Sequence, residues 1–184
     1  LLGGITNAVN VPSLSAEDAR RLKPYMKLAE QIGSFAGQLT ESGINAVAIE
    51  YEGAIAEFNV KPLTATALTG LLAPQLSSVN IVNAPVICRE RDIRVSETLQ
   101  PEPGDYQMLM RLTVTGEGGT RSISGTVFAG DKPRLVSVEG MRLEAELGDH
   151  VLFVRNLDKP GFIGALGTAL AAASINIATF HLGR

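Results

Sequence analysis

The chain has 184 residues, of which 45% are hydrophobic and 19% charged, with a formal net charge of -3. This composition is typical of a globular protein with enough apolar residues for one large domain or two small ones. The acidic balance argues against binding a nucleic-acid backbone, and no window approaches the roughly 20 apolar residues of a membrane span. Neither nucleic acid nor membrane is expected as a partner.

The single cysteine, Cys88, excludes an internal disulfide and a cluster of thiolate metal ligands. Its neighbours Val86 and Ile87 predict a buried, unreactive thiol, and sparse cysteine usage fits a reducing cytoplasm. Residues 1–15 begin without methionine and lack the charged and apolar regions of a signal peptide. We interpret this opening as a cut inside a longer polypeptide.

A helical pattern begins after Ser15, which suits an N-cap and precedes Glu17 and Asp18 in the first turn. Because a helix interior tolerates proline badly, Pro24 predicts a short helix before it and a longer one after it. The longer helix has an apolar stripe that predicts its buried face: Tyr25, Leu28, Ala29, Ile32, Phe35, Ala36 and Leu39.

Between residues 44 and 147 the apolar pattern has a period of two, which indicates strands with one buried side. The clearest segment, "YQMLMRLTVTG", places on one face Tyr106, Met108, Met110, Leu112 and Val114. Similar strands are predicted at 44–53, 91–99, 120–130, 134–140 and 141–147. A helix is predicted from Leu63 to a stop at Pro74, so this region is an α+β domain with a mostly antiparallel sheet.

The last segment follows a linker at 146–150 and reads as a β-α-β unit. A strand at 151–154 precedes Pro160, which suits a first helical turn, and "INIATFHL" at 175–182 predicts the second strand. Gly161, Gly164 and Gly167 suit either close helix packing or a phosphate cradle.

Side chains for catalysis form no familiar constellation in this sequence. His150 and His181 lie far apart, and neither a nucleophile elbow nor a Walker or dinucleotide-binding glycine motif occurs. Basic residues instead recur on the predicted strands, and they suit either a solvated surface or an anion site. Arg134 and Arg142 flank one predicted turn, with Lys132 nearby, so neighbouring strands can direct these charges at one phosphate or carboxylate.

Several stretches carry a family resemblance. "NLDKPGFIGALGTAL" followed by "INIATFHLGR" resembles the first half of an ACT domain, a small module that binds amino acids. "VNIVNAPVICRERDIRVSET" and "SISGTVFAGDKPRLVSVEG" resemble the preceding segment of long-form bacterial D-3-phosphoglycerate dehydrogenases, and "GGITNAVNVP" resembles the exit from their catalytic domains. The likeness covers essentially the whole chain.

The resemblance implies a regulatory region made of three parts. Residues 1–43 are an exit segment with connecting helices, 44–147 an allosteric substrate-binding domain, and 148–184 a truncated, ferredoxin-like ACT domain. Enzymes of this family oxidise 3-phosphoglycerate with NAD in the first step of serine synthesis. Their catalytic and NAD-site residues have no counterpart here, so the chain is expected to hold no cofactor and to lack activity.

The resemblance also implies ligand sites. Serine ligands of the family fall on Asp158 and Asn176, with Asn156 at a variable polar position. Asp158 can hold an ammonium group, Asn176 can donate and accept through its amide, and the free N-H groups after Pro160 can attract a carboxylate; a helix cap for Asp158 and a turn for Asn176 are equal alternatives. The anion-holding basic residues of the family fall near Arg134 and Arg142, with Lys132 beside them. A further family arginine falls on Glu146, which weakens the expected site.

Expected partners are further copies of the chain, the catalytic domains of the same polypeptide, serine, and a phosphoglycerate-like anion. Two alternatives remain at this point: the regulatory domain of an iron-sulfur serine dehydratase, and an assembly domain without a ligand. The lone cysteine argues against an iron-sulfur cluster held by this chain itself.

Overall fold

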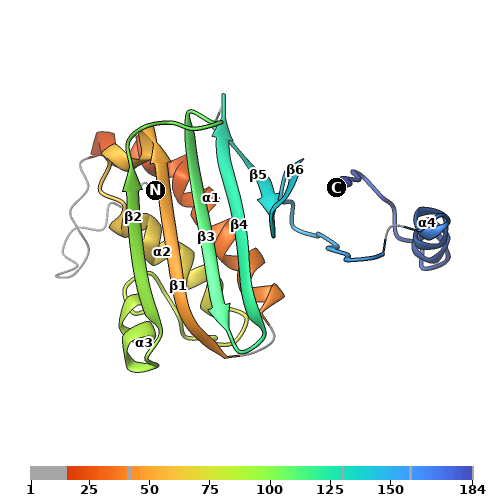
Figure 1. The fold of residues 1–184 in the computed structure, drawn as a ribbon, viewed down its shortest axis with the longest axis horizontal. Helices are drawn as coiled ribbons and strands as arrows, with labels where there is room; N and C mark the ends of the chain where they lie inside the picture. The colour runs from red at the N-terminus through yellow and green to blue at the C-terminus, as the bar shows by residue number, and fades with distance from the viewer. Residues whose placement is uncertain (1–15, 41–42, 130, 158, 184) are drawn as a thin grey trace.

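A computed structural model describes residues 16–40, 43–129, 131–157 and 159–183 (Figure 1). Its helices are α1 (Ala16–Leu39), the 3-10 turn η1 (Ala54–Glu57), α2 (Lys61–Leu72), α3 (Ala84–Glu90) and α4 (Phe162–Ala172). Its strands are β1 (Ile44–Gly53), β2 (Arg94–Gln100), β3 (Met108–Gly116), β4 (Gly119–Phe128), β5 (Lys132–Val138) and β6 (Met141–Ala145). The predicted α+β class is confirmed.

The strands form one six-stranded sheet in the order β2-β1-β3-β4-β5-β6. From β1 through β3, β4, β5 and β6, each neighbouring pair is antiparallel, as the sequence predicts. β2 instead runs parallel to β1, with Ala46 opposite Arg94. A parallel pair needs a long crossover, and α2 and α3 provide it.

The core lies between the sheet and the two helices α1 and α2, which cover one face (Figure 1). Alternate residues of β1 point into this core, and Val47, Ile49 and Tyr51 are fully buried. β3 buries four of the five residues of the predicted face, Met108, Met110, Leu112 and Val114, while Tyr106 precedes the strand and is partly exposed. The period-two pattern therefore reports the side of the sheet that the helices cover.

α1 is one continuous helix that contains Pro24, so the predicted break into two helices is wrong. Proline removes one backbone hydrogen bond from a helix, but apolar residues on both sides of it are anchored in the core. Leu22 before the proline and Leu28 after it are each 1% exposed. Tertiary burial therefore holds the helix together across Pro24.

α1 and α2 pack backbone against backbone at glycines. A Cβ atom added to Gly33 would lie 2.1 Å from the carbonyl oxygen of Ala67, and one added to Gly37 would lie 2.3 Å from that of Leu71. Gly70 of α2 approaches α1 in the same way, with 2.7 Å to the carbonyl oxygen of Glu30. Only residues without a side chain allow this approach.

α4 stands away from the sheet, and none of its residues is buried. The strands predicted at 151–154 and 175–182 are not formed, because neither segment joins the six-stranded sheet and a strand requires a ladder partner. The predicted ferredoxin-like unit is therefore present only as its helix. Among the described residues, no helix combines the length and the hydropathy needed to cross a bilayer.

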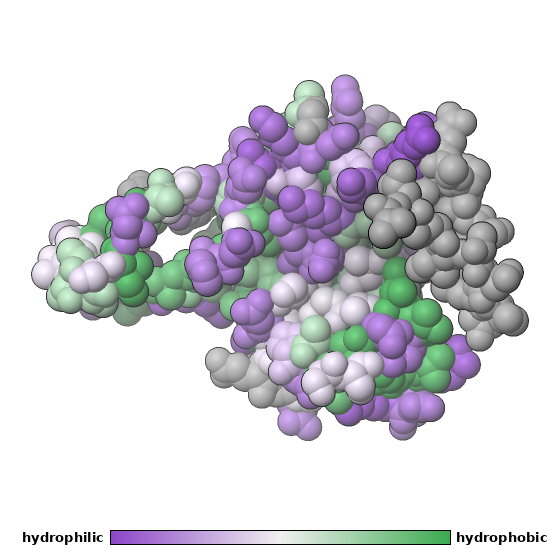
Figure 2. All heavy atoms as spheres, turned by 180° about the vertical axis from the view of Figure 1, so that it is seen from behind, coloured by the Kyte–Doolittle hydropathy of each residue, from purple (hydrophilic) through white to green (hydrophobic). Residues whose placement is uncertain are grey.

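The surface seen from behind the sheet is largely polar (Figure 2). Apolar atoms gather at the lower right of this view, in the region of α3 and β2. Exposed apolar residues of this region are Val82, Val86 and Val95, and Leu99 is exposed nearer the other end of β2.

Candidate functional site

The predicted anion cluster lies on the last hairpin, where β5 and β6 meet at a tight turn. Glu139 and Gly140 form this turn with φ values of 50° and 83°, a left-handed pair that matches the twist of a hairpin. Arg134 lies on β5 and Arg142 on β6, while Lys132 is exposed at the start of β5. The two arginines come from adjacent strands; Arg142 lies opposite Ser137 near the turn, and Arg134 lies at the other end of the hairpin, next to Leu135, which pairs with Ala145.

Arg134 is paired with the carboxylate of Glu146, which directly follows β6 in the chain. Its Nη2 atom lies 3.1 Å from Oε2 of Glu146, and its Nη1 atom donates a hydrogen bond of 3.0 Å to the carbonyl of Pro133. The Arg134 side chain is 19% exposed and that of Glu146 is 69% exposed. Glu146 thus forms its ion pair with the Arg134 guanidinium from the solvent side.

Arg142 binds a different carboxylate. Its Nη2 atom lies 3.0 Å from Oδ2 of Asp105, and the two side chains are 85% and 69% exposed. Arg134 and Arg142 therefore do not share one acidic partner. An anion that reached both guanidinium groups would compete with Glu146 and Asp105, and exposed ion pairs of this kind are weak.

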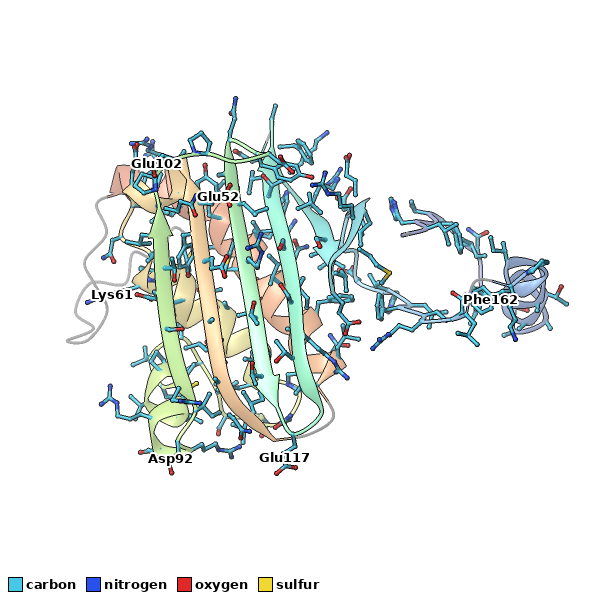
Figure 3. The ribbon with its side chains drawn as sticks, in the orientation of Figure 1. Glu52, Lys61, Asp92, Glu102, Glu117 and Phe162 are labelled. Carbon is cyan, nitrogen blue, oxygen red and sulfur yellow. The ribbon has the colours of Figure 1, made fainter. Side chains whose placement is uncertain are left out.

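The predicted serine ligands flank α4, whose first residue, Phe162, lies far from the sheet (Figure 3). Asp158 lies outside the described residues. Asn156 is exposed and donates a hydrogen bond of 2.9 Å from Nδ2 to the carbonyl of Leu157, and Asn176 is exposed in the segment after α4. Both amides are accessible to a ligand.

A second group of arginines, which the sequence did not single out, lies at the tight turn of the β5-β6 hairpin. Glu139 lies 3.6 Å from Nε of Arg121 and 3.3 Å from Nη1 of Arg155, and its side chain is only 18% exposed. With Gln38, Leu39 and Phe153, these residues line an open cleft of about 230 Å³. The backbone N-H of Glu139 donates to the carbonyl of Ser122 on β4, so the hairpin pairing alone would have placed Arg121 beside this turn.

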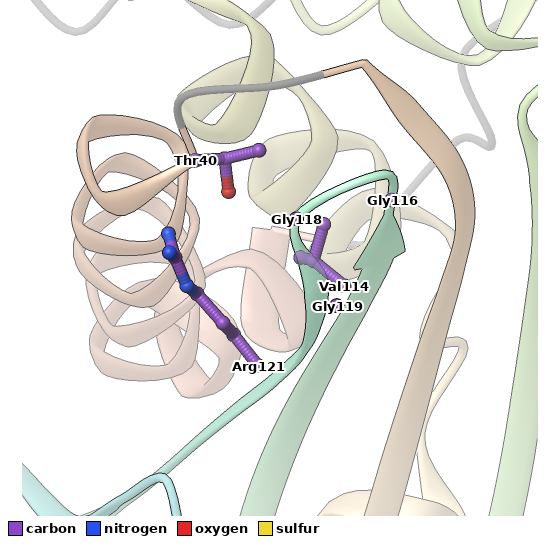
Figure 4. A pocket seen from close by; sticks show the side chains of 6 residues that line it. All are labelled: Thr40, Val114, Gly116, Gly118, Gly119 and Arg121. Carbon is purple, nitrogen blue, oxygen red and sulfur yellow. The ribbon is translucent and has the colours of Figure 1, made fainter.

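Arg121 also lines a second, much smaller hollow at the end of α1 (Figure 4). This hollow of about 10 Å³ admits no more than one water molecule. The last turn of α1 carries no basic residue, and Arg121 extends toward that turn from β4. A cation near the carbonyl end of a helix is favourable, so Arg121 has a structural role there.

A buried hydroxyl relay connects β1, α2 and β2. Tyr51 is fully buried, and its hydroxyl lies 2.9 Å from Oγ1 of Thr64, which in turn donates to the carboxylate of Glu97 on β2. Burial raises the pKa of Tyr51 well above its usual range; the hydrogen bond with Thr64 partly offsets this, and the Glu97 charge adds to the rise. The relay fixes the edge strand β2 to α2.

Cys88 is buried in α3, as predicted from its apolar neighbours. Burial raises the pKa of its thiol, and the positive charge of Arg91 lowers it by a smaller amount. The neutral thiol is therefore favoured, which makes Cys88 a poor nucleophile in the folded chain.

Comparison with known proteins gives a consistent match. Residues 21–139 match the family model described as the D-3-phosphoglycerate dehydrogenase intervening domain. A D-3-phosphoglycerate dehydrogenase of Synechocystis is 36% identical over 97% of this chain and 32% of its own length. Those of Bacillus subtilis and Methanocaldococcus jannaschii are each 32% identical, over 98% and 97% of this chain and 34% of their own length. The chain spans about a third of the length of these curated relatives.

Proposed function

The chain belongs to the D-3-phosphoglycerate dehydrogenase intervening-domain family, and from this membership we propose that it is the regulatory and assembly region of such a dehydrogenase. The whole protein would oxidise 3-phosphoglycerate with NAD in the first step of serine synthesis. This region would contribute effector binding and subunit contacts rather than catalysis. Purified chain should therefore produce no NADH from 3-phosphoglycerate and NAD, and measurable production would contradict this assignment.

The effector is an anion of the phosphoglycerate type, bound by the β5-β6 hairpin. The observation that carries this proposal is the placement of Arg134 and Arg142 on adjacent strands, each paired with one carboxylate that is 69% exposed. Because water screens these ion pairs, Glu146 and Asp105 are weak competitors for a phosphate with more than one negative charge. Lys132 adds a third positive charge at the start of β5.

Isothermal titration calorimetry with 3-phosphoglycerate tests this site. Each charged hydrogen-bonding group is worth about 1.5–3 kcal/mol, so Arg134→Ala and Arg142→Ala should each weaken binding roughly tenfold to a hundredfold. Glu146→Gln should strengthen binding, because it removes a competing charge and keeps the side-chain shape. Arg94→Ala, an exposed arginine on β2, is the matched control and should leave binding unchanged. Unchanged heats of 3-phosphoglycerate binding in both arginine variants would contradict this site.

Serine is the second proposed effector, bound through Asp158, Asn176 and Asn156 beside α4. The support is the family resemblance of "NLDKPGF" and the accessibility of both asparagine amides. Titration with serine against an Asn176→Ala variant tests it. A chain that binds neither serine nor 3-phosphoglycerate but still associates would favour the alternative of a ligand-free assembly domain. Membership in the dehydrogenase family leaves no role for the serine dehydratase alternative.

A further inference from the structure

β2 forms one end of the sheet, with β1 on one side and no further strand beyond it among the described residues. All seven of its residues, Arg94–Gln100, are exposed. An edge strand presents backbone N-H and C=O groups that can pair with another strand, and natural proteins usually block such edges with prolines, bulges or inward charges. β2 contains no proline and its register with β1 is unbroken; its one charge on the helix side, Glu97, is held by Thr64 of α2.

On the helix side of this edge, apolar side chains flank Glu97. Val95 and Leu99 of β2 are 38% and 51% exposed, and Val82 and Val86, before and within α3, are 50% and 44% exposed. Val82, Val86 and Val95 lie at the α3 end of β2 and Leu99 lies toward its other end; we term these four residues the β2 edge patch. Apolar side chains beside an open strand edge favour strand pairing over solvation.

The central five residues of β2, "VSETL", have the same chemical character when the order is reversed: Val95 matches Leu99, and Ser96 matches Thr98. A two-fold axis through Glu97 would place Val95 opposite Leu99 of a second copy and Ser96 opposite its Thr98. The apolar residues would then meet on the helix side and the hydroxyl residues on the other side, as antiparallel cross-strand pairs require. We propose that β2 pairs with β2 of a second copy of this chain about this axis, forming one continuous sheet across two subunits.

The two Glu97 side chains would face each other on the axis. Like charges directly opposite one another weaken an antiparallel pair. Each Glu97 is already held by Thr64 of its own α2, which draws the carboxylate toward its own subunit. The charge of Glu97 therefore limits the strength of the dimer, and removing that charge should increase it.

Disulfide trapping tests the register. In a Glu97→Cys variant the two new cysteines would be directly opposite, with Cα atoms about 4.5–5.5 Å apart, within the range of a disulfide. In a Leu99→Cys variant the equivalent atoms would be about 13 Å apart along the strand and should not join. Cys88 is buried and does not compete. Rapid disulfide-linked dimer from Glu97→Cys alone supports the register, whereas equal or absent trapping in the two variants overturns it.

Sedimentation equilibrium tests the surface. Val95→Lys and Leu99→Lys should each raise the dimer dissociation constant at least tenfold, while Phe128→Lys, at a 39% exposed apolar residue on β4, should leave it unchanged. Glu97→Gln keeps an acceptor for Thr64 and should lower the dissociation constant about two- to fivefold. A monomeric chain, or association unaffected by the β2 substitutions, would overturn the proposal. The inference is independent of the proposed anion site, because none of these residues lies on β5 or β6.

Discussion

Replacing Thr64 by valine should destabilise the chain more than removing the Tyr51 hydroxyl with which it interacts. Tyr51 is 0% exposed and its hydroxyl lies 2.9 Å from Thr64 Oγ1, so Thr64→Val leaves a buried hydroxyl without that hydrogen bond. A buried group stripped of its partner costs about 1–3 kcal/mol. Tyr51→Phe leaves no buried polar group without a hydrogen-bond partner, because Thr64 still donates to the exposed Glu97. This substitution should therefore cost about 1 kcal/mol.

Urea unfolding of the two single variants and the double variant measures these values, with far-ultraviolet circular dichroism as the signal. The double variant should be less destabilised than the sum of the two single variants. Once the tyrosine hydroxyl is absent, Thr64→Val no longer leaves a buried hydroxyl without a hydrogen-bond partner. The slope of the free energy with urea should stay constant. Additive effects, or a larger cost for Tyr51→Phe than for Thr64→Val, would refute the relay.

The same relay predicts a dependence on alkaline pH. The pKa of Tyr51 is raised in the folded chain, so the folded state keeps a proton that the unfolded state loses at about pH 10. The stability contributed by the neutral phenol is complete below that pH and declines as pH rises above it. The free energy of unfolding should therefore fall above about pH 10 and should fall less steeply in Tyr51→Phe.

Three further outcomes follow from the packing. Gly33→Ala places a Cβ atom 2.1 Å from a carbonyl oxygen of α2 and should cost about 2 kcal/mol or more in thermal or urea unfolding, whereas Gly43→Ala, with nothing within 4 Å, should cost little. Cys88 should react slowly with a thiol reagent in buffer and rapidly in urea, since its pKa is raised by burial, and equal rates would contradict its burial. Phe153→Ala loses an edge-to-face contact with Phe35 at 5.6 Å and should lower the free energy of unfolding in urea by about 0.5–1.5 kcal/mol, whereas an unchanged value would contradict that contact.

The strongest periodic patterns in the sequence predict the sheet well. In β3 every second residue from Met108 to Val114 is buried, because two helices cover one side of that strand and solvent covers the other. The parallel direction of β2 could not be predicted in this way. All of its residues are exposed, so it has no buried face, and its direction follows from the path of α2 and α3.

Two local rules were overridden by tertiary packing. Pro24 was expected to end a helix, but buried leucines on both sides keep α1 intact. The apolar residues around α4 were expected to form strands, but hydrogen-bonded partners, which the local sequence does not specify, decide whether an apolar segment becomes a strand.

The candidate site was predicted in its elements but not in its contacts. Arg134 and Arg142 lie on adjacent strands as expected, but their pairing with Glu146 and Asp105 depends on how the chain runs outside the hairpin. The link from Tyr51 through Thr64 to Glu97 joins residues far apart in sequence and has no periodic signature. The sequence therefore predicts where charges lie more readily than which partners they meet.

The parallel pairing of β1 with β2 also bears on the order of folding. β3, β4, β5 and β6 follow one another through short turns and can pair soon after collapse, whereas β1 and β2 are joined only after the intervening helices form a closed loop. Contacts made late are absent from the rate-limiting transition state. Substitutions in β2 should therefore accelerate unfolding and leave the refolding rate nearly constant, while substitutions in the β3-β4 hairpin should slow refolding.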